Sequence, residues 1–297
     1  MRFKKVSALY FCSIFIVFFS ANTFSFGDLT VTPTRVIFEG RERAKTISLV
    51  NRGTKVSTFR IEFSEMSMDE YGGLKEIKEP KDGQKFSSDF IKFAPRQVTI
   101  EPGKSQTVRL LVRKPSGLPE GEYRSHLVMY AVPDSDQNAI SLENFSELKE
   151  KEVGFQVSAI IRVAIPVIIR EGELEASFEI SDVEINNLDN LNAPISPELK
   201  ADRNFAPNIT FDLSRKGNRS VYANVDVLYK DNANPESQYL IGSLKDYVVY
   251  VPNSHRVAQI PLDIPSELKD LNGTVDVIFY KSEEGDKEIL AKSTVDI

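Results

Sequence analysis

The sequence predicts an all-β protein made of two β-sandwich domains. Almost every apolar segment alternates with a period of two or is a short β-branched run, and apolar residues at helical spacing are scarce. Glycine and proline separate these segments, for example in the Pro-Gly turn at residues 101–104 between two predicted strands. Short strands joined by such turns are typical of a sandwich and not of a parallel sheet covered by helices.

The N-terminus has the layout of a secretory signal peptide. Positive charges precede an apolar run over residues 6–19, and a polar stretch follows that ends at Ser25. The run is shorter than the roughly 20 residues that a spanning helix needs, which disfavours the alternative of a membrane anchor. We therefore expect a signal peptide at residues 1–25, and its removal would also remove Cys12, the one cysteine of the chain.

The length and the charge distribution indicate a domain boundary near residue 172. The chain that follows the signal peptide has the size of two ordinary domains. Residues 26–172 carry 22 lysines and arginines against 21 aspartates and glutamates, whereas residues 173–297 carry 12 against 22. We expect an N-terminal domain at 26–172 and a C-terminal domain at 173–297. Neither has the concentrated positive charge of a nucleic-acid-binding protein.

Each domain has its own series of predicted strands. In the first domain they lie at residues 29–32, 35–40, 45–51, 58–63, 98–100, 107–112 and 123–132. In the second they lie at residues 174–186, 208–213, 220–229, 247–251, 257–264, 275–280 and 289–295. Residues 71–74 and 282–287 fit the tips of hairpins. The one candidate helix, residues 141–152, is charged nearly throughout and fits a loop equally well.

Residues 155–170 form the clearest period-two pattern of the chain. Its odd positions are all apolar: Phe155, Val157, Ala159, Ile161, Val163, Ile165, Val167 and Ile169. Sixteen residues at about 3.3 Å each span roughly 50 Å, whereas strands usually have roughly 3–10 residues. Pro166 has no N–H and is tolerated at an edge, a bulge or a bend. The pattern therefore predicts an edge strand that outruns its own sheet.

Two interpretations of this strand remain open. A long apolar edge promotes aggregation unless something covers it, and one cover is a partner polypeptide that completes its own fold with this strand. The other interpretation is a long, bent core strand that bridges two domains and binds no partner.

Catalytic residue patterns are absent from the sequence. Its two histidines, His126 and His255, are too far apart for a zinc motif, and no glycine-rich phosphate loop is present. We expect His126, in the middle of an alternating strand, to be a structural histidine with satisfied hydrogen bonds, and His255 to lie in a turn. The sequence therefore predicts no enzyme, no cofactor and no metal site.

Several segments of the first domain resemble the PapD-like family of periplasmic pilus and fimbrial assembly chaperones. They are VTPTRVIFEG at residues 31–40, ISLVN at 47–51, FAPRQVTIEPG at 93–103, GEYR at 121–124 and the strand at 155–170. The resemblance covers most of residues 29–170, whereas it is weak over 173–297. It implies two immunoglobulin-like sandwiches at an angle, with a cleft between them.

The resemblance also implies a site for a pilus subunit. Arg35 and Arg162 would bind the subunit's C-terminal carboxylate, as two guanidinium groups held side by side without acidic partners. The strand donated to the subunit would include Val153, Phe155, Val157 and Ala159. Three features depart from the family. The stretch at residues 134–152 is long and acidic, and Tyr123 shifts the alignment near Glu122, the implied structural acid, by about one residue. Pro166 stands where other members have an arginine of an interdomain ion network, so this network is not expected here.

Together these observations predict a divergent chaperone that a cleavable signal peptide directs to the periplasm. It would bind secreted pilus-type subunits by donor-strand complementation and deliver them to an outer-membrane usher, with no stable membrane insertion. A self-capping homodimer is a further expected state. The alternative is a secreted structural or adhesive two-domain β-sandwich protein with no chaperone role.

Overall fold

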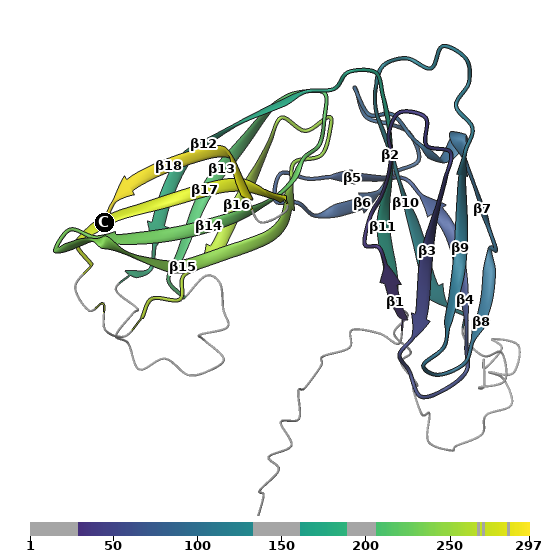
Figure 1. The fold of residues 1–297 in the computed structure, drawn as a ribbon, viewed down its shortest axis with the longest axis horizontal. Coiled ribbons are helices and arrows are strands. Elements are labelled where there is room, and N and C mark those ends of the chain that lie inside the picture. Colours follow the sequence, from purple (N-terminus) through teal and green to yellow (C-terminus); the bar gives the residue numbers. More distant parts are fainter. Residues whose placement is uncertain (1–28, 133–160, 189–205, 266–267, 269–270, 284–285) are drawn as a thin grey trace, which may run out of the picture.

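The computed structural model describes residues 29–132, 161–188, 206–265, 268, 271–283 and 286–297 (Figure 1). Within these residues the chain is almost entirely β-strand, and its one helical segment is the 3₁₀ turn η1 (Ser88–Phe90). This part of the chain includes no helix that is long and apolar enough to cross a membrane. Figure 1 shows two sandwiches that meet at an angle, so the predicted all-β fold is confirmed.

The first sandwich packs a four-stranded sheet against a five-stranded one. The first sheet has the order β1 (Leu29–Thr32), β3 (Ala44–Asn51), β9 (Ser105–Val112) and β7 (Ile91–Ala94). The second has the order β2 (Val36–Phe38), β11 (Arg162–Glu171), β10 (Gly121–Ala131), β4 (Ser57–Ser64) and β8 (Gln97–Ile100). Alternate residues of these strands point inward, so that Phe38, Leu49, Phe59, Leu110 and Leu127 form a buried core.

The second sandwich is built in the same way from the rest of the chain. A three-stranded sheet has the order β12 (Ala176–Asn186), β13 (Asn208–Gly217) and β16 (His255–Pro261). A four-stranded sheet has the order β15 (Asn234–Val248), β14 (Tyr222–Asp231), β17 (Gly273–Glu283) and β18 (Asp286–Asp296). Their inner faces bury a separate core that includes Phe211, Leu213, Val225, Tyr229 and Phe279.

A hairpin of the first sandwich reaches across to the second (Figure 1). It consists of β5 (Met66–Met68) and β6 (Leu74–Glu76), and its tip lies at the predicted residues 71–74. Met68 packs against Val248 and Tyr250 in a small apolar cluster between the sandwiches. The backbone N–H of Val257 donates to the carbonyl of Glu70 at 2.8 Å. The hairpin therefore gives the two sandwiches a contact besides the linking chain.

Two local predictions in the second sandwich are wrong. Strand β15 begins at Asn234, whereas the sequence predicted a strand only from Tyr247 onward. The prediction missed the first part of β15 because most of its side chains are polar and exposed on an edge strand, so they show no apolar alternation. His255 begins β16 and does not lie in the preceding turn.

Candidate functional site

The first half of strand β11 has an open edge on the side where β2 pairs with its second half. Strand β10 pairs with it over the range from Arg162 to Glu171. On its other side β2 pairs in parallel with Val167, Ile168 and Ile169 only. Within the described residues, the backbone of β11 from Arg162 to Pro166 therefore has no strand partner on the side of β2. Such an edge is a template for an added strand.

The apolar face of β11 emerges from the core along this open edge. Val167 and Ile169 are fully buried and Ile165 is 3% exposed, whereas Val163 is half-buried and Ile161 is 48% exposed. An apolar stripe that becomes exposed toward the start of the strand is a surface that lacks a cover. The predicted strand-donor residues continue the same odd-numbered pattern but lie outside the described residues: Val153, Phe155, Val157 and Ala159.

Arg35 lies directly before β2, at the end of this open edge. Its guanidinium Nη1 donates to Oδ1 of Asp246 at 2.7 Å, across the boundary between the sandwiches. The same guanidinium lies over the ring of Tyr222, at 4.5 Å from the ring centroid. The predicted arginine is thus in the cleft, but an acidic partner already holds it.

Arg162 has different neighbours. It makes ion pairs with Glu62 at 3.1 Å and with Glu76 at 3.2 Å. Because Val36 is opposite Val167, Arg35 lies beside Pro166, four residues beyond Arg162, which corresponds to about 13 Å along the sheet. The structure therefore does not bring the two predicted arginines side by side, and the expectation that they lack acidic partners is wrong.

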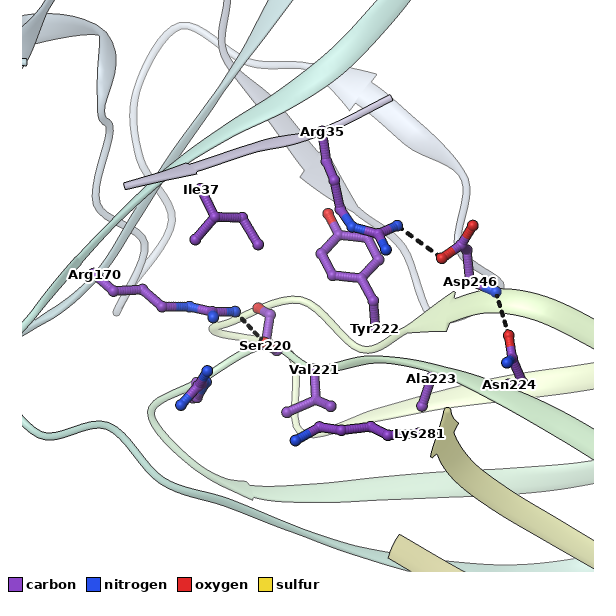
Figure 2. Close-up of a pocket in the computed structure, with 11 residues that line it drawn as sticks. Arg35, Ile37, Arg170, Ser220, Val221, Tyr222, Ala223, Asn224, Asp246 and Lys281 are labelled. Carbon is purple, nitrogen blue, oxygen red and sulfur yellow. Dashed lines mark hydrogen bonds and ion pairs between the residues drawn. The ribbon is translucent and has the colours of Figure 1, made fainter. Parts of the chain in front are cut away.

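A cavity of about 380 Å³ lies between the two sandwiches at Arg35 (Figure 2). Four basic side chains line it, namely Arg35, Arg170, Arg219 and Lys281, and Asp246 is the one acidic residue of the lining. The lining of the cavity is thus predominantly basic, and residues of both sandwiches form it.

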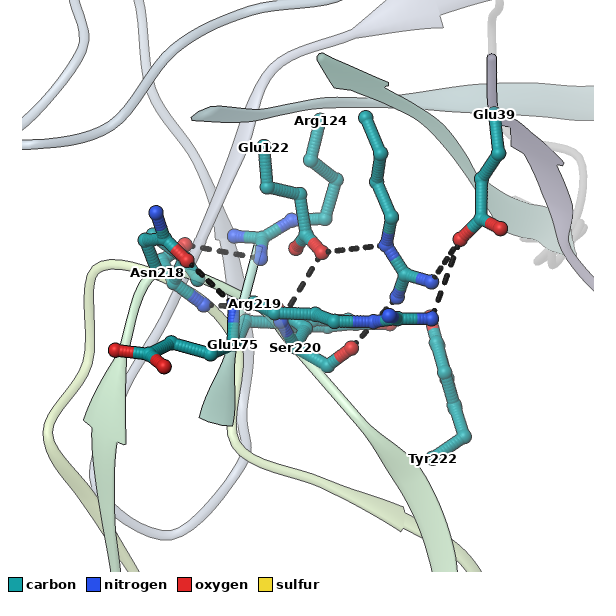
Figure 3. A network of polar contacts seen from close by, with 11 residues as sticks. Glu39, Glu122, Arg124, Glu175, Asn218, Arg219, Ser220 and Tyr222 are labelled. Carbon is teal, nitrogen blue, oxygen red and sulfur yellow. Dashed lines mark hydrogen bonds and ion pairs between the residues drawn. The ribbon is translucent and has the colours of Figure 1, made fainter. Parts of the chain in front are cut away.

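Beside this cavity an ion network, buried at Arg170 and Glu122, joins the sandwiches (Figure 3). Arg170 donates to Glu122 at 3.1 Å, to Glu39 at 2.5 Å and to the backbone carbonyl of Ser220 at 2.6 Å. The N–H of Ser220 donates to the same Glu122 oxygen at 3.0 Å, and Arg219 pairs with Glu39 at 3.3 Å. The hydrogen bond from Arg170 lowers the pKa of Glu39. Charged side chains of both sandwiches and backbone groups of the second therefore pair across the boundary, whereas Oε1 of Glu122 is buried without a hydrogen-bond partner among the described residues.

The expectation that the chain has no interdomain ion network is wrong. Pro166 carries no charge, but Arg170 takes part in such a network. Glu122 is confirmed as a structural acid, since its side chain is 1% exposed and paired. The signal was available in the sequence: Glu122 directly precedes the strand predicted at residues 123–132, and Arg170 ends the strand predicted at 155–170. Antiparallel pairing of these two strands places Glu122 opposite Arg170.

His126 lies at the same junction and is only partly as predicted. It is buried at the centre of β10, but neither ring nitrogen has a hydrogen-bond partner among the described residues. Burial and the nearby charge of Arg124 lower its pKa to about 3. Arg124 itself stacks at 3.8 Å on the ring of Tyr250, which belongs to the second sandwich. The histidine is therefore structural and neutral, but not satisfied as expected.

Comparison with known proteins identifies the first sandwich. Residues 28–174 match the family described as pili and flagellar-assembly chaperone, PapD N-terminal domain. Comparison with curated protein sequences gives no significant match.

Three solved chaperone structures are similar to this chain at low sequence identity. The CsuC-CsuE chaperone-tip adhesion subunit complex of Acinetobacter baumannii is 12% identical, with 88% of this chain and 96% of that chain covered and a TM-score of 0.41. The DraB chaperone of E. coli is 9% identical, with 91% and 95% covered and a TM-score of 0.40. The CupB2 chaperone of Pseudomonas aeruginosa is 12% identical, with 90% and 98% covered and a TM-score of 0.39.

The family is one of chaperones and not of enzymes. Through residues 28–174, the chain belongs to the PapD-like family of pilus and flagellar-assembly chaperones.

Proposed function

We propose that the protein is a periplasmic chaperone that binds a secreted pilus-type subunit by adding a strand to the subunit's fold. The subunit strand pairs with the open edge of β11 and with the segment before it. Two observations together support the proposal: within the described residues the backbone edge at Arg162–Pro166 has no strand partner on the side of β2, and the apolar face of this strand becomes exposed toward Ile161. Addition of a strand to a free sheet edge is an established mode of recognition, of which chaperone–pilin complexes are themselves an example.

The position of Arg35 fits the end of such an added strand. The open slot beside β11 is closed where β2 begins to pair, at Val36 opposite Val167. Arg35 directly precedes this point, and Pro166 has no N–H with which to continue a ladder. A subunit strand that runs parallel to β11 would therefore end at Arg35, where a guanidinium suits a terminal carboxylate.

Arg162 takes a different part in the proposal. It lies about 13 Å along the edge from Arg35 and is exposed, so it would contact the subunit strand and not the same carboxylate. The donor residues of the preceding segment, Val153, Phe155, Val157 and Ala159, would fill the subunit's groove. The complex needs no cofactor, because the subunit's better final packing supplies the energy for transfer to an outer-membrane usher.

Site-specific photo-crosslinking tests the proposal. A photoreactive amino acid replaces Ile161, and a matched control replaces Leu240, which is 57% exposed but lies on β15 of the other sandwich. In cells of the native organism we expect Ile161 and not Leu240 to crosslink to a small secreted β-protein. A synthetic peptide of residues 153–163 should compete, and a scrambled peptide should not.

Two outcomes would contradict the proposal. Crosslinks of equal yield at both positions would indicate nonspecific contact. A subunit that binds without any crosslink at Ile161, or that the peptide does not displace, would place binding elsewhere and favour a structural or adhesive role. Crosslinks between two copies of the chain in cells that lack the subunit would support the predicted self-capping homodimer.

A further inference from the structure

Arg35 is held by a group with the same chemistry as the ligand proposed for it. Asp246 presents a carboxylate to the guanidinium at 2.7 Å, from the opposite side of the cleft (Figure 2). The Asp246 side chain is 63% exposed and that of Arg35 is 35% exposed, so water and solutes reach the pair. The ion pair is therefore positioned for exchange with another carboxylate.

The backbone around Asp246 is shaped to make this contact. Asp246 has a φ of 54°, in the left-handed region that residues other than glycine seldom adopt. It lies in β15 where the pairing with β14 shifts register between Ala223 and Val225, and its N–H donates to the side-chain oxygen of Asn224 at 3.2 Å. Bulges of this kind redirect a side chain, and locally unfavourable backbone is common at functional sites.

The rest of the cavity favours an anion once Asp246 has moved. Among its lining residues, Arg170 is saturated by the interdomain network and Arg219 is paired with Glu39. Lys281 makes, within the described part of the chain, one loose ion pair of 3.6 Å with Glu288. Displacement of Asp246 leaves Arg35 unpaired in a lining with no other acid, so an entering carboxylate meets an attractive field.

We propose that Asp246 occupies Arg35 in place of the subunit's terminal carboxylate, and that the subunit must displace it to bind. This inference rests on the proposed function of Arg35. A free carboxylate gains little by replacing Asp246, because one ion pair of Arg35 is exchanged for another. A subunit that also adds a strand to β11 makes further contacts along this strand, and these contacts offset the loss of the pair between Arg35 and Asp246. Asp246 thus makes the cleft selective for ligands that engage both sites.

A titration of Arg35 with a minimal carboxylate tests this inference. The probe is acetate, added at constant ionic strength in exchange for chloride, with acetamide as a neutral control. The signal is the Nε–H resonance of Arg35 in the full chain without its signal peptide. The variants are Asp246→Asn and the matched control Asp182→Asn. Asp182 also has a positive φ, of 49°, and also lies at a strand irregularity, but in β12 and away from the cleft.

We expect acetate to bind Arg35 about two- to fivefold more tightly in Asp246→Asn than in the wild type, since exposed ion pairs contribute modestly and occupancy by Asp246 reduces the free fraction of the site. Asp182→Asn should bind as the wild type does. Equal affinity in the wild type and in Asp246→Asn overturns the displacement while leaving Arg35 as a carboxylate site. An Arg35 signal that acetate does not shift in Asp246→Asn overturns both this inference and the proposed role of Arg35.

Discussion

Replacement of Arg170 by alanine tests how the two sandwiches are held together. The change leaves Glu122 charged, with its side chain 1% exposed and one hydrogen bond from Ser220. Removal of one partner from a buried ion pair costs about 3–5 kcal/mol. The loss of the contact with Glu39 adds little, because that side chain is 50% exposed. We therefore expect Arg170→Ala to lower the free energy of unfolding by roughly 3–5 kcal/mol.

Urea unfolding followed by circular dichroism measures this change, and Arg162→Ala is the matched control. Arg162 also has two carboxylate partners, but all three side chains are at least 42% exposed, so its loss should cost less than about 1 kcal/mol. The double variant Glu122→Gln/Arg170→Gln should be more stable than Arg170→Ala, because it leaves neither member of this pair as a buried charge without its partner. Equal costs for Arg170→Ala and Arg162→Ala would refute the reasoning.

Three further predictions concern the buried polar groups and the interdomain hairpin. His126 has a pKa of about 3 in the folded protein. Between about pH 6.5 and pH 3 the unfolded chain therefore binds a proton that the folded chain does not bind. We expect urea unfolding to show a decrease of about 2–3 kcal/mol in the free energy of unfolding when the pH falls from 7 to about 4.5. His126→Leu should reduce this loss, and an unchanged loss would contradict the assignment. A Cβ on Gly72 would collide with the guanidinium of Arg256, so Gly72→Ala should speed hydrogen exchange at the hairpin contact, unlike Gly103→Ala, which also has a positive φ but an open surrounding. Asp276 is buried beside two lysines and a threonine, so Asp276→Asn should lower the free energy of unfolding by about 1–3 kcal/mol. A decrease below about 0.5 kcal/mol in urea unfolding would contradict its role in the second sandwich.

The strands that the sequence predicts well are those with one face in a core. The alternation in residues 208–213 corresponds to β13, because burial of every second side chain fixes both the pattern and the strand. The strand predicted at residues 123–132 corresponds to β10, which is buried on both faces over most of its length. The first part of β15 has the opposite property. Its side chains are largely exposed on an edge, so its pairing with β14 determines the strand and leaves no apolar period to read.

The sequence predicts those features of the site that depend on the neighbouring residues of the chain, and not those that depend on tertiary packing. The position of Arg35 at the start of a short strand and the apolar stripe toward Ile161 follow from the sequence. Their acidic partners do not, because Arg35 meets Asp246 across 211 positions of the chain, through the packing of two sandwiches. Arg162 illustrates the same limit: its separation from Arg35 follows from the register of β2 against β11, which no single strand's pattern specifies.

Hydrogen exchange at β11 tests the central claim most directly. The amides of the open edge at Arg162–Ile165 are compared in the free chaperone and in the complex with its captured subunit, with β8, the opposite edge of the same sheet, as the internal reference. The account predicts slower exchange in β11 on binding and no change in β8. Unchanged exchange in β11, or protection of β8 in its place, would show that the subunit does not add its strand to this edge.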